Sequence, residues 1–160
     1  MNKKFVGIMA ATSYGLIGRN NSLPWHCEED LKFFEERTFG HYMIIGRKTY
    51  ESLPARLLVD RKSIVFSRTI SDVENGIVVS SIEEFKQSIS TINDDQIFMI
   101  GGSQIAHLFL QNSMLSSFLL TIIHGKYSGD SYLNLKYFDN CQKETLMKSK
   151  EFDRVRFDFY

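Results

Sequence analysis

The sequence predicts an α/β protein in which helices cover a mostly parallel sheet with an antiparallel edge. Continuous apolar runs, such as residues 5–12 (FVGIMAAT) and 97–100, are typical of strands buried on both faces. Segments with apolar residues at helical spacing alternate with these runs, as in α/β sheets. Residues 152–160 instead alternate apolar and polar side chains, which predicts an antiparallel hairpin with residues 144–148.

Size and composition favour one domain that spans residues 1–160. A chain of 160 residues buries roughly two-thirds of its surface on folding, enough for a core without disulfides. The 19 basic and 19 acidic residues cancel, so no bulk charge predicts a nucleic acid or a membrane as partner. The two cysteines form no disulfide framework, and no cysteine–histidine cluster has metal-site spacing. The first apolar run is too short for a signal peptide or a membrane span, so we expect a cytoplasmic protein.

Helix signals in the first half of the chain are strongest after residue 27. The acidic run at residues 28–30 favours a helix start, and Leu31, Phe34 and Thr38 fall on one face. Gly46 ends an apolar run. In order, we expect a strand at 5–12, a loop at 13–24, a helix at 28–38, a strand at 42–45 and a short helix at 47–53.

The second half repeats the pattern. Ser81 and Glu84 have the spacing of a capping box, in which side chain and backbone bond reciprocally at a helix start. The pair Gly101-Gly102 separates an apolar run from the next helical segment. We expect strands at 63–67, 77–79, 97–100 and 118–123, and helices at 81–90 and 103–111.

Asp30 is the first candidate for chemistry. It lies on the helix face of Phe34 and beside Leu31, so it is either a partly buried acid that can exchange a proton or a solvated first-turn residue facing the helix dipole. The spacing alone leaves both interpretations open.

Two further segments are candidates for binding an anion. Gly101-Gly102 lets a ligand approach the backbone before a helix N-terminus, or it forms a simple tight turn. Arg47, Lys48 and Thr49 open a short helix and, with Arg68, either bind phosphate or form a solvated basic face. Trp25, the only tryptophan, follows Pro24, and we expect its apolar ring to anchor the preceding loop to the core.

Taken in order, these segments resemble the dihydrofolate reductase family. One Gly-Gly pair means little, but a series of such motifs in the right order and spacing is specific. The matching segments are residues 8–11, 15–18, 23–25, 29–31 with 33–34, 45–52, 61–62, 100–103, 120–121 and 129–130.

The resemblance implies a central eight-stranded sheet, parallel except for its last strand, and the reduction of 7,8-dihydrofolate to tetrahydrofolate with NADPH. It places Asp30 as the sole ionisable group of the pterin pocket, where it promotes protonation of N5 while C6 receives the hydride. Thr121 supports Asp30, and the loop with Leu23 and Trp25 closes over the nicotinamide. It also implies a monomer that binds antifolate inhibitors, and a cis peptide at Gly101-Gly102.

The resemblance also implies which residues touch the ligands. Those expected around the substrate are Ile8, Met9, Leu31, Phe34, Leu53, Ile100 and Arg61, the last holding the glutamate carboxylate. Those expected around the cofactor are Ala10, Ile17, Gly18, Gly46, Arg47, Lys48, Thr49, Ser67, Arg68, Gly101, Gly102, Ser103, Gln104 and Ile105.

The chain departs from the family pattern at three places. Ala106 replaces a usual Tyr or Phe near the nicotinamide and pterin, which predicts either a gap or a space that another side chain or water fills, and a faster hydride transfer in Ala106→Tyr. Residues 56–61 (RLLVDR) replace a usual Pro- and Gly-containing loop, which leaves Arg56 as an alternative to Arg61 for the glutamate carboxylate. Leu133-Asn134 stands where an aromatic residue or a Phe-Pro pair is common. Two alternatives follow: a related pyrimidine or pterin reductase of the same fold, against which Trp25 and Asp30 argue, and a cofactor-binding module without catalysis.

Overall fold

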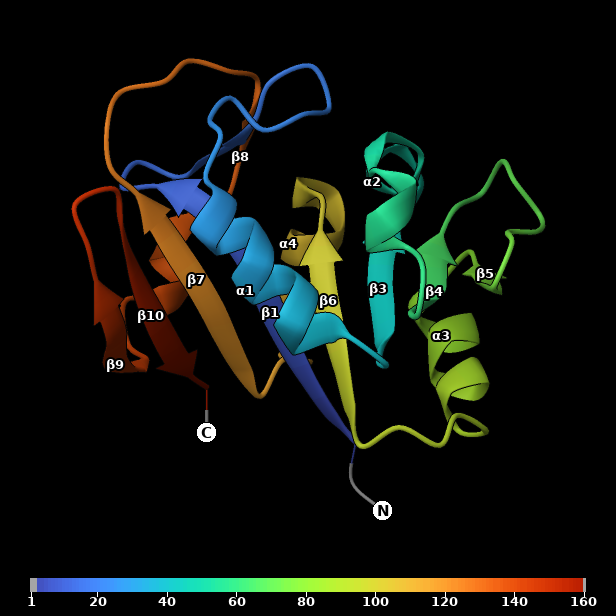
Figure 1. Ribbon diagram of the computed structural model, residues 1–160. Coiled ribbons are helices and arrows are strands. Elements are labelled where there is room, and N and C mark those ends of the chain that lie inside the picture. The colour runs from blue at the N-terminus through green and yellow to red at the C-terminus, as the bar shows by residue number, and fades with distance from the viewer. Residues whose placement is uncertain (1–2, 160) are drawn as a thin grey trace.

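An eight-stranded sheet runs through the whole molecule (Figure 1). The computed structural model describes residues 3–159. Along the sheet the strand order is β5-β4-β3-β6-β1-β7-β10-β9, and every neighbouring pair is parallel except the two that contain β10. The strands are β1 (Lys4–Thr12), β3 (Tyr42–Gly46), β4 (Lys62–Phe66), β5 (Gly76–Val79), β6 (Gln96–Gly101), β7 (Ser117–Ile123), β9 (Gln142–Lys148) and β10 (Phe152–Asp158).

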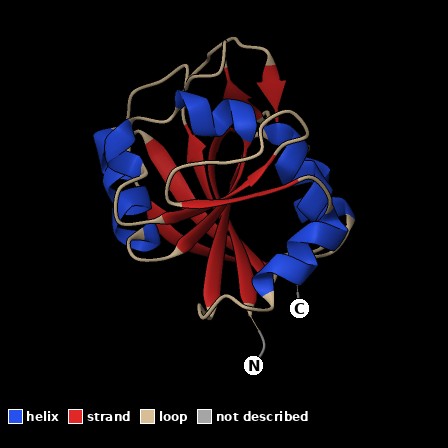
Figure 2. Ribbon diagram, turned by 90° about the vertical axis from the view of Figure 1, so that its right-hand side faces the viewer, coloured by secondary structure: helices blue, strands red, loops and turns tan. Residues whose placement is uncertain are grey.

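Helices cover both faces of this sheet (Figure 2). On one face, Phe33 and Phe34 of α1 pack with Tyr50 of α2 over apolar side chains of the central strands. On the other face, Phe85 of α3 and Phe109 of α4 meet edge to face with ring centroids 5.2 Å apart. The helices are α1 (Glu28–Thr38), α2 (Arg47–Ser52), α3 (Ile82–Ile89) and α4 (Ser103–Gln111), with 3₁₀ turns η1 (Ala55–Leu57) and η2 (Leu135–Phe138).

The predicted capping box is present at the start of α3, with one difference. Ser81 Oγ accepts a hydrogen bond from the Glu84 backbone N–H at 3.1 Å. The Glu84 carboxylate reaches one residue further back than expected and accepts from the Ser80 N–H at 2.6 Å. The first bond satisfies an N–H group that a helix start would otherwise leave without a partner, and the second ties the residue before the cap to the first turn.

The predicted fold class is confirmed, including the parallel sheet and its antiparallel last strand. The loop expected at 13–24 is partly wrong: β2 (Leu16–Gly18) is buried and pairs with β8 (Ser131–Tyr132). A strand of three residues is too short for periodicity to identify. Tyr160, the last residue of the predicted hairpin, lies outside the described residues.

The arrangement of the strands decides where a site can form. The carboxyl ends of β1, β3, β4, β6 and β7 share one edge of the sheet because these strands are parallel. Across the described residues 3–159, no helix has the length and apolar character needed to cross a membrane.

Candidate active site

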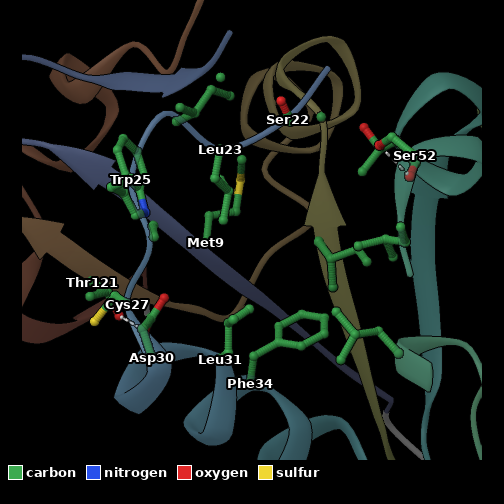
Figure 3. A pocket seen from close by; sticks show the side chains of 18 of the residues that line it. Met9, Ser22, Leu23, Trp25, Cys27, Asp30, Leu31, Phe34, Ser52 and Thr121 are labelled. Carbon is green, nitrogen blue, oxygen red and sulfur yellow. Dashed lines mark hydrogen bonds between the residues drawn. The ribbon is translucent and has the colours of Figure 1, made fainter. Parts of the chain in front are cut away.

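A cavity of about 450 Å³ opens at this edge, between α1, α2 and the loop at residues 19–27. Figure 3 shows Asp30, Leu31 and Phe34 rising from α1 on one side, with Leu23 across the cavity from them and Met9 of β1 between. Most of the lining is apolar, and a few polar groups converge in it, as is usual for small-molecule sites.

Asp30 sits in the first turn of α1, and its carboxylate is held by the sheet behind it. Thr121 of β7 donates a hydrogen bond from Oγ1 to Asp30 Oδ1 at 2.6 Å. The Asp30 side chain is 17% exposed, so it is the partly buried acid of the two interpretations that the sequence left open. In the described part of the chain, Oδ2 has no hydrogen-bond partner, and Figure 3 shows it directed into the cavity. This oxygen is therefore free to accept donors from a ligand.

A second charged group, Arg154 of β10, contacts Asp30, so the prediction that Asp30 is the sole ionisable group of the pocket is wrong. Its Nη2 lies 3.2 Å from Asp30 Oδ1, and its Nε lies 3.4 Å from Thr121 Oγ1. Arg154 and Thr121 are opposite each other in the antiparallel register of β10 and β7, so both side chains point toward α1. Sequence reasoning missed Arg154, although its spacing of two residues from the buried Phe152 places both on one sheet face.

The side chains expected around the substrate do line the cavity, with one exception. Arg61 is 5% exposed and its guanidinium is used inside the protein, where it donates to Thr38 Oγ1 and to the carbonyls of Val59 and Glu35 at 2.7–2.8 Å. Burial lowers the pKa of Arg61, against the opposing effect of Glu35 and Asp60. Those that line the cavity are Ile8, Met9, Leu31, Phe34, Leu53 and Ile100.

Arg56 lies at the rim in place of Arg61. It lines the cavity and pairs with Glu35 from α1. The role of Arg61 toward a carboxylate stays a prediction.

Residues expected around the cofactor form two groups. One group lines the cavity: Ala10, Ile17, Gly18, Thr49 and Gly102. The other group lies at or directly after the carboxyl ends of β3, β4 and β6: Gly46, Arg47, Lys48, Ser67, Arg68, Gly101, Ser103, Gln104 and Ile105.

The backbone at this edge is close to its neighbours. A Cβ on Gly102 would lie 3.0 Å from Thr49 Oγ1, and one on Gly46 would lie 3.1 Å from Ile105 Cγ1. Gly101 has φ +104°, which favours glycine, and the Gly101-Gly102 peptide is cis as expected.

The loop that carries Leu23 and Trp25 lies over the cavity. Leu23 is 48% exposed, whereas Trp25 is 8% exposed and meets the Tyr127 ring at a centroid distance of 5.7 Å. The Asp130 carboxylate accepts from the Asn20 N–H at 3.2 Å, which links this loop to residues 124–130.

Ala106 does not leave a gap; other core side chains pack around it, which is the second of the two predicted outcomes. It is fully buried on α4 within the core that contains Phe109, and it is not among the residues that line the cavity. Arg56, the alternative to Arg61, lines the cavity; lining residues that sequence reasoning did not assign to the site are Asn21, Ser22, His26, Cys27, Phe33, Ser52, Pro54, Leu57, Asp130 and Ser131. Most of these lie in loops or at helix ends, where no periodicity identifies them.

Comparison with known proteins points to one family. A family model described as dihydrofolate reductase matches residues 4–160. Dihydrofolate reductase of Bacillus subtilis (strain 168) is 39% identical over 127 residues, which are 78% of this chain and 72% of that protein. A bifunctional dihydrofolate reductase-thymidylate synthase of Paramecium tetraurelia is 32% identical over 158 residues, 99% of this chain, which spans 34% of that longer protein.

A solved structure has the same fold. Dihydrofolate reductase from Enterococcus faecalis, complexed with NADP(H) and RAB-propyl, superposes with a TM-score of 0.78 at 23% identity. The superposition covers 97% of this chain and 95% of that one.

Proposed function

Because the chain belongs to the dihydrofolate reductase family and therefore reduces dihydrofolate with NADPH, we propose that the reaction takes place in the cavity beside α1, with Asp30 as its catalytic carboxylate. The observation that carries the proposal is Asp30 itself. Its Oδ1 is held by protein donors while its Oδ2 faces an apolar cavity. A carboxylate in such a place requires donors, and the N–H groups of a pterin ring supply them.

The edge beside the cavity fits NADPH. The missing Cβ of Gly102 leaves backbone open next to Thr49, and α4 begins there without a side-chain cap, so its first N–H groups suit a phosphate. Arg68 is exposed nearby, and Arg47 is paired with Glu51 at 2.7 Å. NADPH, when bound, supplies the hydride that reduces C6. The residues that would hold it are the two groups of cofactor residues named above.

Each group around Asp30 has a different task. Asp30 Oδ2 accepts the N–H donors of the pterin ring and so fixes its orientation, and the carboxylate favours proton delivery to N5 through a water. Thr121 is a positioning residue, because it acts through its hydrogen bond to Oδ1. Leu31 and Phe34 exclude other water from the ring, and Leu23 closes the cavity from above.

The remaining predictions from the sequence are part of the same proposal. Strands from both halves of the chain meet in one sheet, which supports a single domain over residues 1–160. The monomeric state, the cytoplasmic location and the binding of antifolate inhibitors stay predictions. No observation favours the related reductase or the module without catalysis.

The test is the loss of NADPH absorbance on addition of dihydrofolate, with Asp30→Asn compared with wild type. We expect the variant to lose about 10²–10⁴-fold in kcat/KM, because an amide neither holds the ring as a carboxylate does nor assists the proton. Glu29→Gln is the matched control, since Glu29 is exposed on the same helical turn. Full activity in Asp30→Asn would show that the catalytic group lies elsewhere.

A further inference from the structure

Arg154 is a charged side chain that the reaction as proposed does not use. Only 8% of the side chain is exposed, and its guanidinium carbon lies 3.6 Å from the centroid of the Phe33 ring and 4.9 Å from that of Phe152. A guanidinium packed against two rings has lost most of its water, so a partner of opposite charge must compensate it. Both rings also hold its plane in place through cation–π contact.

Asp30 is the anionic partner of Arg154 within residues 3–159. The other contacts of the guanidinium are a long hydrogen bond to Thr121 Oγ1 and a weak one to Met147 Sδ at 3.9 Å. Together with the Thr121 hydroxyl, Arg154 brings two donors to Oδ1 and none to Oδ2. Arg154 and Thr121 together therefore fix the rotation of the Asp30 carboxylate and leave Oδ2 for the ligand.

We propose that Arg154 is a positioning and specificity-determining residue: it orients Asp30 and balances its charge, so that the pocket prefers neutral rings with N–H donors over cationic rings. The proposal rests on the proposed role of Asp30 in binding the pterin. Dihydrofolate presents a neutral ring, so its N–H groups donate hydrogen bonds to Oδ2 without the ring needing a charge of its own.

The charge preference follows from the position of the guanidinium. A lone carboxylate in an apolar cavity attracts a cationic ligand strongly, because little water screens the two charges. With Arg154 already 3.2 Å from Oδ1, a second cation at Oδ2 gains less from the carboxylate and is repelled by the guanidinium. A neutral ring meets no such repulsion.

The experiment compares two ligands that differ mainly in charge. 2,4-Diaminopteridine accepts a proton on its ring and binds a carboxylate as a cation, whereas 2-amino-4-oxopteridine binds as a neutral ring. Their dissociation constants are measured by fluorescence titration with wild type, Arg154→Met, Arg154→Gln and Arg154→Lys. Arg156→Met is the matched control, because Arg156 lies on the same strand but pairs with Glu144 and Asp158 at the surface.

We expect Arg154→Met and Arg154→Gln to shift the ratio of the two dissociation constants toward the cation by about tenfold or more. Arg154→Lys restores the charge, so its ratio stays near that of wild type, as does the ratio of Arg156→Met. An unchanged ratio in either neutral variant that binds NADPH normally would overturn the proposal and leave Arg154 a packing residue. If Arg154→Met does not fold, Arg154→Gln decides alone.

Activity of the wild-type protein separates this proposal from the one on which it rests. Suppose that the wild-type protein oxidises NADPH with dihydrofolate, while the Arg154 variants keep the wild-type ratio of the two pteridine dissociation constants. That result refutes the charge preference only. A wild type that binds neither pteridine refutes the role of Asp30 and the charge preference together.

Discussion

Replacing Thr121 by valine tests how much the support of Asp30 contributes to catalysis. The change keeps the shape of a side chain that is 2% exposed and removes one hydroxyl. That hydroxyl donates a 2.6 Å bond to a carboxylate, and bonds to charged groups contribute about 1.5–3 kcal/mol. Arg154 remains on Oδ1, so we expect the lower end, which corresponds to a decrease in kcat/KM for dihydrofolate of about tenfold.

The assay is steady-state NADPH oxidation, with thermal unfolding followed in parallel. Thr12→Val is the matched control, because buried Thr12 also loses a hydroxyl bond, to the Leu16 N–H at 3.0 Å, yet is not among the residues lining the cavity. We expect this control to lower the melting temperature and to leave kcat/KM near the wild-type value. If Thr121→Val keeps full kcat/KM while losing as much stability as Thr12→Val, the positioning argument is refuted.

Three further predictions concern groups away from the carboxylate. Ala106→Tyr forces a ring into a fully buried site and should lower the free energy of unfolding by about 1–3 kcal/mol, measured by urea denaturation; unchanged stability would reveal hidden space. The pKa of His124 is raised, chiefly because Nδ1 donates to the Lys150 carbonyl and further by Asp153. Protonated His124 therefore stabilises the fold at pH values below the ordinary histidine pKa, and this contribution is lost as the pH rises through the raised pKa. An NMR titration checks the direction by comparing the pKa of His124 with that of free imidazole. Burial raises the pKa of the Cys141 thiol, so iodoacetamide should modify it more slowly in the folded than in the unfolded chain, as mass spectrometry can show.

Elements with strong local signals could be predicted from the sequence. The helix at Glu28–Thr38 has an acidic first turn and an apolar face, and the structure has it with the predicted bounds. The buried strands were recognisable because both of their faces are apolar. Short β2 and β8 were not, since each is stabilised by its partner rather than by its own residues.

Side-chain partnerships between distant residues could not be predicted in the same way. Asp30 and Arg154 are 124 residues apart in sequence, and only the position of β10 beside β7 brings them together. The alternating pattern of β10 identifies Val155 and Phe157 as its buried side chains, and these face the opposite side of the sheet from Arg154. Likewise, the carbonyls that bind the Arg61 guanidinium carry no sequence signal.

The central place of β1 in the sheet has a consequence for biosynthesis. This strand is made before the other described strands, yet its partners β6 and β7 pair with it only after the ribosome has passed Gln96 and Ser117. Such distant pairings make folding slow and leave an apolar segment open to chaperones or to aggregation during translation. Because β10 docks on β7 later still, the nascent chain acquires its Asp30–Arg154 pair, and with it a competent pocket, among its last native contacts.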